Sequence, residues 1–296
     1  MTISFDTNNS NLLLAKSKNR KWYRTAIFWI SAPLILITLT CVFASFLPLS
    51  DPNELDLSST VLPPFFMNGG SMAHPLGTSN LGQDLLSELI FGGRTTIFIG
   101  LVGMLGGALP GILLGLVAGF SRGIVDTVIA RLIDAQLSLP FILVALAVIA
   151  SRGHSVGVIL TVLALTTWPF FARVIRSEAL SLRERPFVMS LRSAGVTRTR
   201  ILLRHILPNL FGTVVVLSTL GIGAAILIES AIDFLGLGVT APGLSWGSIL
   251  ASGQSQIGTA WWIAAWPGMM ISVFVLLVNL LGDELISRFD PRYRNR

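Results

Sequence analysis

Six long apolar runs constrain this chain more than any other feature of its sequence. A helix needs about 20 mostly apolar residues to cross the hydrocarbon core of a bilayer. Only 12% of the 296 residues are charged, whereas a soluble domain carries about 25%. The runs therefore predict an all-α polytopic membrane protein with six transmembrane helices, at approximately Thr25–Leu47, Thr95–Phe120, Val128–Ala150, Val156–Phe171, Leu210–Phe234 and Trp261–Ile286.

The first run is too long for a secretory signal peptide. The apolar region of such a peptide spans about 7–15 residues and is followed by a small-residue cleavage site. No such site follows Thr25–Leu47 before Pro48. We therefore expect the first run to be an uncleaved anchor helix.

Lysine and arginine predict the orientation of these helices. If the N-terminus is placed inside, all but two of the 21 Lys and Arg residues fall in inner segments, the exceptions being Arg94 and Arg152. This asymmetry follows the positive-inside rule. It predicts a multi-pass protein of the cell (inner) membrane with both termini in the cytoplasm, and it accounts for the net charge of +6 without a nucleic-acid partner. The outer segment after the first run is acidic, with Asp51, Glu54, Asp56, Asp84 and Glu88.

The second run is rich in glycine, and several of its glycines are four residues apart. Small residues let membrane helices approach closely, which a packed bundle requires and a lone anchor does not. Pro110 lies in the middle of the run, where it should bend the helix or free a carbonyl group. Static packing and a hinge role are equally compatible with each of these glycines: Gly100, Gly103, Gly106, Gly107, Gly111, Gly115 and Gly119.

A polar stretch between the fourth and fifth runs carries eight arginines between Arg173 and Arg204. Gly195 is placed to end a first short helix in the left-handed conformation, and Thr197 is placed to cap a second one. Pro208 stops that second helix or starts the next span. We expect residues 183–209 to form a cytoplasmic helix–turn–helix whose apolar faces contain Phe187, Val188, Leu191 and Ala194, then Ile201, Leu202 and Ile206.

Taken alone, this helix–turn–helix is compatible with a surface-lying amphipathic hairpin that holds anionic lipid and with a docking element for a cytosolic partner. Its sequence resembles the coupling loop, or EAA loop, of permease subunits in bacterial ATP-binding-cassette importers. Gly195 and the pair Leu207–Pro208 match the anchors of that loop. Met-Ser-Leu at 189–191 stands where Glu-Ala-Ala is expected, so the first half departs from the pattern.

Four further segments resemble the dipeptide, oligopeptide and nickel permease group of these importers, and in particular the second of its two permease types. The likeness covers nearly everything from Thr25 onwards, although Ser79 and Gln83 replace the usual Asp and Arg. The segments are "HPLGTSNLGQDLLSELIFGGRTTIFIG" (74–100), "DAQLSLP" (134–140), "ESAIDFLGLGVTAPGLSWGSIL" (229–250) and "WPGMMISVFVLLVNLLGDELISRFDPR" (266–292).

This resemblance implies a type I importer permease fold and a set of partners. They are a second homologous permease subunit, two ATPase subunits that bind ATP–Mg, an extracytoplasmic substrate-binding protein and membrane lipid. No cofactor, metal or enzymatic activity is expected in the chain itself, which has no Gly-x-x-x-x-Gly-Lys-Ser/Thr run. The implied organisation is 1–94 for the cytoplasmic N-terminus, anchor helix and extracytoplasmic segment, 95–286 for the permease core with its coupling loop at about 183–209, and 287–296 for the cytoplasmic tail.

The implied function is the import of short peptides, driven by ATP hydrolysis on the partner subunits. Nickel or a metal chelate is the alternative substrate. An ion-driven secondary transporter is disfavoured because the runs show no clear midplane charge, and an intramembrane enzyme because no histidine lies within a run. The resemblance assigns contact with the ATPase to Phe187, Leu191, Arg192, Gly195, Thr197, Leu203, Leu207 and Pro208.

Two acids near the outer end of the fifth run have two interpretations. Glu229 lies about 20 residues, or about 30 Å, into that run, and Asp233 shares its side of the helix four residues later. They form either a polar lining of an outer gate or an interfacial, water-exposed pair.

The remaining polar residues have simpler explanations. Arg131 and Asp134 are three apart and are expected to pair on one helix rather than bind substrate. His74, His154 and His205 are scattered, so no metal site is expected. An aromatic belt at the outer interface accounts for Trp246, Trp261, Trp262 and Trp266.

Overall fold

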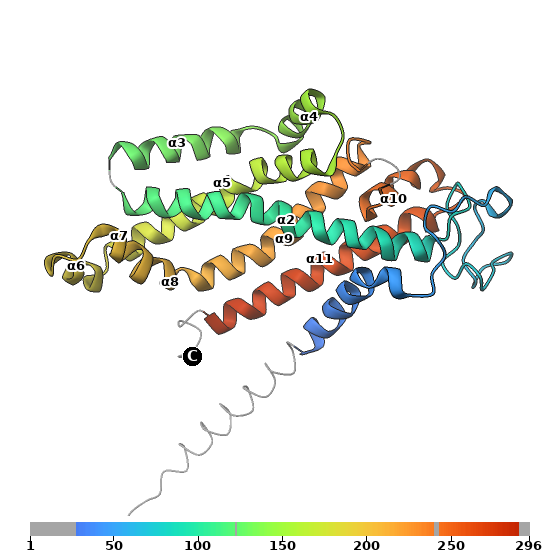
Figure 1. Cartoon of the computed structure of the whole chain (residues 1–296), viewed down its shortest axis with the longest axis horizontal. Helices are drawn as coiled ribbons and strands as arrows, with labels where there is room; N and C mark the ends of the chain where they lie inside the picture. The colour runs from blue at the N-terminus through green and yellow to red at the C-terminus, as the bar shows by residue number, and fades with distance from the viewer. Residues whose placement is uncertain (1–27, 122, 240–242, 290–296) are drawn as a thin grey trace, which may run out of the picture.

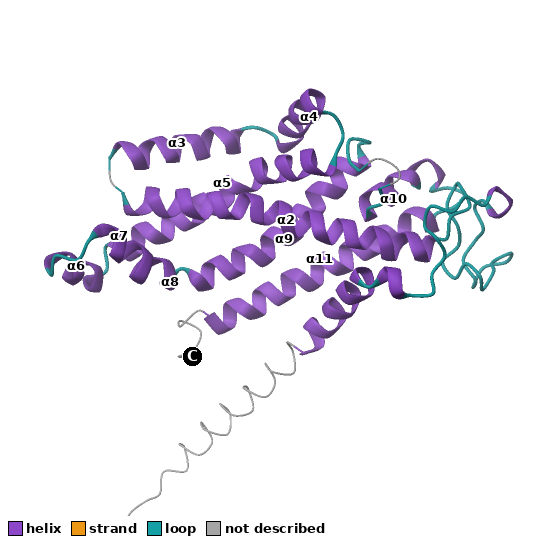
Figure 2. Ribbon diagram, in the orientation of Figure 1, coloured by secondary structure: helices purple, strands orange, loops and turns teal. Residues whose placement is uncertain are grey.

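Long helices that lie side by side give the molecule its elongated shape (Figure 1). The computed structural model describes residues 28–121, 123–239 and 243–289, and these are helical or irregular with no β-strand (Figure 2). After an N-terminal helix, Phe28–Val42, the elements are η1 Ala44–Phe46, η2 Leu57–Ser59, α2 Leu85–Phe120, α3 Ile124–Ser138, α4 Phe141–Arg152, α5 Val156–Arg183, α6 Pro186–Ser193, α7 Arg198–Ile201, η3 Leu202–Ile206, α8 Leu207–Asn209, α9 Phe211–Phe234, α10 Trp246–Ser252, η4 Gln254–Gln256 and α11 Trp262–Phe289.

Four helices, α2, α5, α9 and α11, are long and apolar enough to cross a membrane. The pair α3 and α4 passes the same test only when the two are taken together. The predicted first span is represented by Phe28–Val42, and its residues 25–27 lie outside the described part of the chain. The all-α membrane fold predicted from the apolar runs is therefore confirmed.

The third predicted span, Val128–Ala150, is wrong as a continuous helix. Helix α3 ends at Ser138, α4 begins at Phe141, and the two axes are bent by 88°. Pro140 explains the break, because proline lacks a backbone N–H and disfavours helical backbone in the residue before it. The apolar composition of the run does not reveal the break, because the residues on either side of Pro140, Leu139 and Phe141, are themselves apolar.

Two spans are longer than predicted. Helix α2 starts ten residues before Thr95, where the Asp84 side chain accepts a hydrogen bond from the backbone N–H of Ser87 at 2.9 Å. Helix α5 continues to Arg183, well past the predicted end at Phe171. Hydropathy locates only the part of a helix that lies in lipid, so both extensions into polar sequence were missed.

A stripe of glycines holds α2 against α5, the most extensive helix contact in the structure. A Cβ placed on Gly111 would lie 2.5 Å from the carbonyl oxygen of Trp168, and one on Gly115 would lie 2.5 Å from that of Ala172. Real Cβ atoms do not approach so closely. Of the two interpretations left open by the sequence, static packing accounts for Gly111 and Gly115, and α2 and α5 form one closely fitted pair.

The two ends of the bundle differ in character (Figure 1). One end carries the short helices α6 and α7, and the other carries α10 and the irregular segment 43–84. The hydroxyl of Thr78 orders this segment by donating to the Ser59 carbonyl at 2.6 Å and accepting from the Leu62 N–H at 2.8 Å. Exposed Asp56 caps η2, and hydrogen bonds from Ser58 hold the pKa of its carboxyl below the ordinary value.

Candidate functional site

A short helical hairpin projects from the bundle between α5 and α9, as the sequence predicts. Helix α6 ends in a Schellman motif, in which the N–H of Val196 donates to the Leu191 carbonyl at 3.1 Å and that of Gly195 to the Arg192 carbonyl at 3.0 Å. Gly195 has φ +72°, the left-handed conformation expected of it. We call residues 186–209, which comprise α6, α7, η3 and α8, the hairpin.

The second half of the hairpin is less regular than predicted. Thr197 occupies the N-cap position of α7, but its side chain makes no capping hydrogen bond. Helix α7 lasts four residues and passes into the π-helical turn η3. Pro208 lies within α8, which ends at Asn209 just before α9 begins. The chain thus remains helical from Arg198 to Asn209, and one turn residue, Leu210, joins the hairpin to α9.

The hairpin has a buried underside and an exposed tip. Val188, Ile201 and Ile206 are fully buried against the bundle. The prediction that Phe187 and Ala194 also face the bundle is wrong, because Phe187 is 39% exposed and Ala194 is exposed. Helical spacing identified an apolar face, but α6 is two turns long and only its centre meets the bundle.

The structure separates the predicted coupling residues into two groups. Leu191 and Leu207 are partly buried against the core. The others are exposed: Phe187, Arg192, Gly195, Thr197, Leu203 and Pro208. Of these, Arg192 places its guanidinium 5.2 Å from the centre of the Phe120 ring. Exposed apolar and basic side chains therefore share the tip of the hairpin.

Arg183, the last residue of α5, makes a contact that the sequence did not indicate. Its Nη1 donates to the carbonyl oxygens of Gly119 at 3.1 Å, Phe120 at 3.4 Å and Ser121 at 3.1 Å, and the residue is 6% exposed. Sequence reasoning counted Arg183 among the arginines that hold the loop inside. No local pattern distinguishes it from its exposed neighbour Arg185.

Two ion pairs join α3 to α5, and they correct the predicted pair of Arg131 with Asp134. Asp134 instead accepts from Arg173 at 2.9 Å, with both side chains more than half exposed. Asp126 accepts from Nε of Arg176 at 2.6 Å and from its Nη2 at 3.1 Å. Spacing within one helix identified a compatible partner, but the packing of α3 on α5 supplies a different arginine.

Glu229 and Asp233 are buried at the end of α9 that leads to α10, with exposed fractions of 0% and 3%. The interpretation of a water-exposed pair is therefore wrong. Asp233 accepts from the hydroxyl of Ser245 and from the N–H of Val239 at 2.8 Å. Oε1 of Glu229 has no hydrogen-bond partner in the described part of the chain. Asp233 thus fastens the segment that connects α9 to α10.

Trp246 follows that segment and belongs to the core rather than to an interfacial belt. It is fully buried, its indole N–H donates to the Leu89 carbonyl at 2.7 Å, and its backbone N–H donates to Oγ1 of Thr96 at 3.0 Å. Its ring packs edge-on against Phe274. The belt interpretation is wrong for this tryptophan, which attaches α10 to α2.

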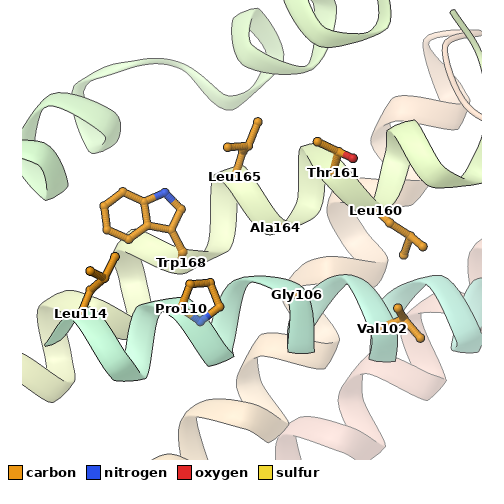
Figure 3. Close-up of a pocket in the computed structure, with 9 residues that line it drawn as sticks. All are labelled: Val102, Gly106, Pro110, Leu114, Leu160, Thr161, Ala164, Leu165 and Trp168. Carbon is orange, nitrogen blue, oxygen red and sulfur yellow. The ribbon is translucent and has the colours of Figure 1, made fainter. Parts of the chain in front are cut away.

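An apolar pocket of about 520 Å³ opens on the α2–α5 face. Figure 3 shows Pro110 of α2 beside Trp168 of α5, with Leu165 pointing away from α2. None of its lining residues is charged, so it offers no partner for the termini of a zwitterionic ligand. They are Val102, Gly106, Pro110, Leu114, Leu160, Thr161, Ala164, Leu165 and Trp168.

A second pocket, of about 440 Å³, lies at the end of the bundle that carries α10, and both polar and apolar side chains line it. Glu88 of α2 is one of them, is 4% exposed, and keeps Oε2 without a hydrogen-bond partner among the described residues. Amide and hydroxyl side chains also line it, including Asn53, Asn80, Gln83 and Ser248. This hollow therefore contains a carboxyl group and hydrogen-bonding side chains, which the pocket on the α2–α5 face has in smaller number.

A glycine-packed set of membrane-length helices, with a helical hairpin at one end and an ordered irregular segment at the other, is the architecture of a polytopic membrane protein. Comparison with known proteins gives the family. The chain belongs to the binding-protein-dependent transport system inner membrane components, whose family model matches residues 111–295.

Curated relatives cover most of the chain. It is 38% identical over 262 residues to the di/tripeptide transport system permease protein DppC of Pseudomonas aeruginosa, which covers 88% of this chain and 86% of the relative. It is 36% identical to the dipeptide transport system permease protein DppC of Alkalihalophilus pseudofirmus, with 88% and 85% covered. The probable D,D-dipeptide transport system permease protein DdpC of Escherichia coli is 33% identical, with 88% and 85% covered.

A solved structure has the same fold. The match is to a chain of the MetNI methionine ABC transporter in an inward-facing conformation, with a TM-score of 0.59. It covers 70% of this chain and 98% of that one at 18% identity. The predicted type I importer permease fold is confirmed.

Proposed function

We propose that this chain is one of two permease subunits of an importer for short peptides, powered by two separate ATPase subunits that bind ATP–Mg. Its family and its relatives named as dipeptide and di/tripeptide permeases support this substrate class. The structural observation that carries the mechanism is the hairpin, which is the only described element between two membrane-length helices that combines a buried anchor with an exposed apolar and basic tip.

In this mechanism the hairpin faces the cytoplasm and is the part that the ATPase moves. Val188, Ile201 and Ile206 hold its underside to the bundle. The exposed tip, with Phe187 and Leu203, supplies the apolar contact with the ATPase, and the exposed arginines there favour acidic residues on that partner. ATP-driven closure of the two ATPase subunits displaces the hairpin and switches the side to which the bundle opens.

The outer end would meet the extracytoplasmic binding protein that delivers the peptide. Because Glu229 and Asp233 are buried, we propose that they serve the outer gate by fixing the α9–α10 segment and not by lining a water-filled path. The second permease subunit would complete the path. The termini would lie in the cytoplasm, with 1–94, 95–286 and 287–296 as the units of the chain.

The test is reconstitution of the complete assembly with its binding protein in liposomes. We expect uptake of a labelled dipeptide or tripeptide that requires ATP on the hairpin side. Uptake driven by an ion gradient with this chain alone would contradict the proposal. Uptake of a nickel chelate in place of the peptides would overturn the substrate class.

A further inference from the structure

Two arginines contact the last turn of α2: Arg183 at the end of α5, just before the hairpin, and Arg192 in the hairpin itself. Arg183 places one nitrogen against three consecutive carbonyl oxygens at 119–121, and Arg192 of α6 stacks on the ring of Phe120. The last carbonyls of a helix lack intrahelical partners and form the negative end of its dipole. A buried guanidinium is well matched to them in both hydrogen bonding and charge.

Retention of the loop inside the cell does not explain the burial of Arg183. Positive-inside asymmetry requires basic residues in the loop but not their burial, and exposed arginines of the same region satisfy it: Arg185, Arg198, Arg200 and Arg204. Burial of a charged group is costly unless it is hydrogen-bonded. The position of Arg183 therefore needs a reason of its own.

The contacts of Arg183 and Arg192 with residues 119–121 form a clasp on the last turn of α2, and α2 connects this clasp to the far end of the molecule. Its 36 residues extend about 54 Å at 1.5 Å per residue. Along this length the glycine stripe fixes α2 to α5, so the two helices cannot slide apart locally. At the outer end, Thr96 and Leu89 accept the two hydrogen bonds from Trp246 of α10. A displacement of the inner end of α2 would therefore reach the α9–α10 segment.

We propose that Arg183 is the positioning residue that fastens the last turn of α2 to the end of α5 from which the hairpin extends, so that movement of the hairpin is passed to α2 and through it to the outer end. This inference rests on the proposed function, because it needs an ATPase that moves the hairpin. Arg183 touches no substrate. It determines how many ATP molecules are hydrolysed for each opening of the bundle.

The experiment measures ATP hydrolysed per peptide imported by the whole assembly in liposomes. Arg183→Gln removes the charge, and we expect the ratio to rise about fivefold or more, since coupling between sites is typically worth 5–150-fold. Arg183→Lys should restore most of the coupling, because a single ammonium can replace the one nitrogen that serves all three carbonyls. Arg94→Gln is the matched control, since Arg94 is an exposed arginine at the outer part of the same helix.

The outcomes separate this inference from the proposed function. If the wild-type assembly imports peptide but Arg183→Gln keeps the wild-type ratio, the role of Arg183 is overturned and the importer stands. If the wild-type assembly imports no peptide, the proposed function fails first. If Arg183→Gln does not assemble, Arg183→Met decides: it replaces the buried guanidinium with an apolar side chain of similar length. A raised ratio then supports the role of Arg183, whereas the wild-type ratio overturns it.

Discussion

Asp233 shows how a membrane acid can serve the fold instead of a ligand. An acid inside a membrane segment is ordinarily a candidate for function. Here both carboxylate oxygens are occupied, one by the hydroxyl of Ser245 and one by the N–H of Val239. Ser245 also accepts from the N–H of Ser248 at 3.0 Å and so caps α10. The Ser245 hydroxyl thus donates one hydrogen bond, to Asp233, and accepts one, from the N–H of Ser248.

We predict that Ser245→Ala destabilises the protein by about 1–3 kcal/mol, because it leaves a buried carboxylate oxygen without its donor and removes a helix cap. Thermal unfolding in detergent would measure the change. Ser272→Ala is the matched control, since Ser272 is exposed and bonds only to Gly268 of its own helix. Equal stability of the two variants would contradict the role given to Ser245.

Individual contacts were the part of the site least accessible from sequence. The burial of Arg183 and the pairing of Asp134 with Arg173 both join residues that are far apart in the chain, by 64 and 39 positions for their respective partners. Periodicity reports which residues share a helix face and says nothing about which face of another helix they meet. Glu229 and Asp233 were located at the correct end of α9, but their burial depends on α10, which had no recognisable signal.

At the scale of elements, the hairpin was predictable because the residues that determine it lie close together in the sequence. Glycine is the residue type that adopts a φ of +72° without a steric cost, and it stands at position 195. The apolar residues on either side of it repeat at helical spacing. Nothing lies within 4 Å of a Cβ placed on Gly195, so a substitution there strains the backbone without a clash. A substitution at Gly195 therefore tests the need for a left-handed backbone there and not the packing around the residue.

We predict that Gly195→Val weakens binding of the ATPase subunits, because a left-handed residue with a Cβ costs about 1–2 kcal/mol and valine tolerates it poorly. Copurification of the assembly would measure the loss. Gly195→Asn should bind nearly as the wild type, since asparagine adopts this conformation more readily than other residues. Normal assembly and transport in the valine variant would argue strongly against the coupling role of the hairpin.

Helix boundaries were predicted less well than helix existence. Asp84 caps α2 ten residues before the apolar run begins, and polar residues continue α5 to Arg183. In both cases the helix extends beyond the part that hydropathy can detect. The break at Pro140 was visible as a proline, but its 88° bend follows from how α3 and α4 pack on different parts of α5.

At the scale of the whole molecule, the charge asymmetry predicts that the hairpin and residue 53 lie on opposite sides of the membrane. We expect Asn53→Cys, in a Cys41→Ala background, to react with a membrane-impermeant maleimide added to intact cells. Thr197→Cys should react only after permeabilisation. Both Asn53 and Thr197 are exposed in the structure, so accessibility reports the side and not burial. Labelling of Thr197→Cys from outside would reverse the orientation and remove the coupling mechanism.

The class of fold was predictable from the chain because membrane spans need only length and apolar composition. The arrangement of those spans was not, since it depends on which glycine face meets which neighbour. The sequence left a packing role and a hinge role open for Gly103, Gly106, Gly107 and Gly111, and only the structure shows that each of them faces α5. The resemblance to a known family implied how the spans pack against one another, which composition and helical spacing alone left open.

The elbow at Leu139–Pro140 has a consequence for the assembled transporter. Both residues are exposed, and their backbone lies outside regular helix in the middle of an apolar stretch. Acyl chains offer no hydrogen bonds to unpaired backbone, so an irregular segment that lies within a bilayer must face protein or water. In the proposed importer, the flank that bears this elbow would therefore face the second permease subunit or a water-filled space and not lipid.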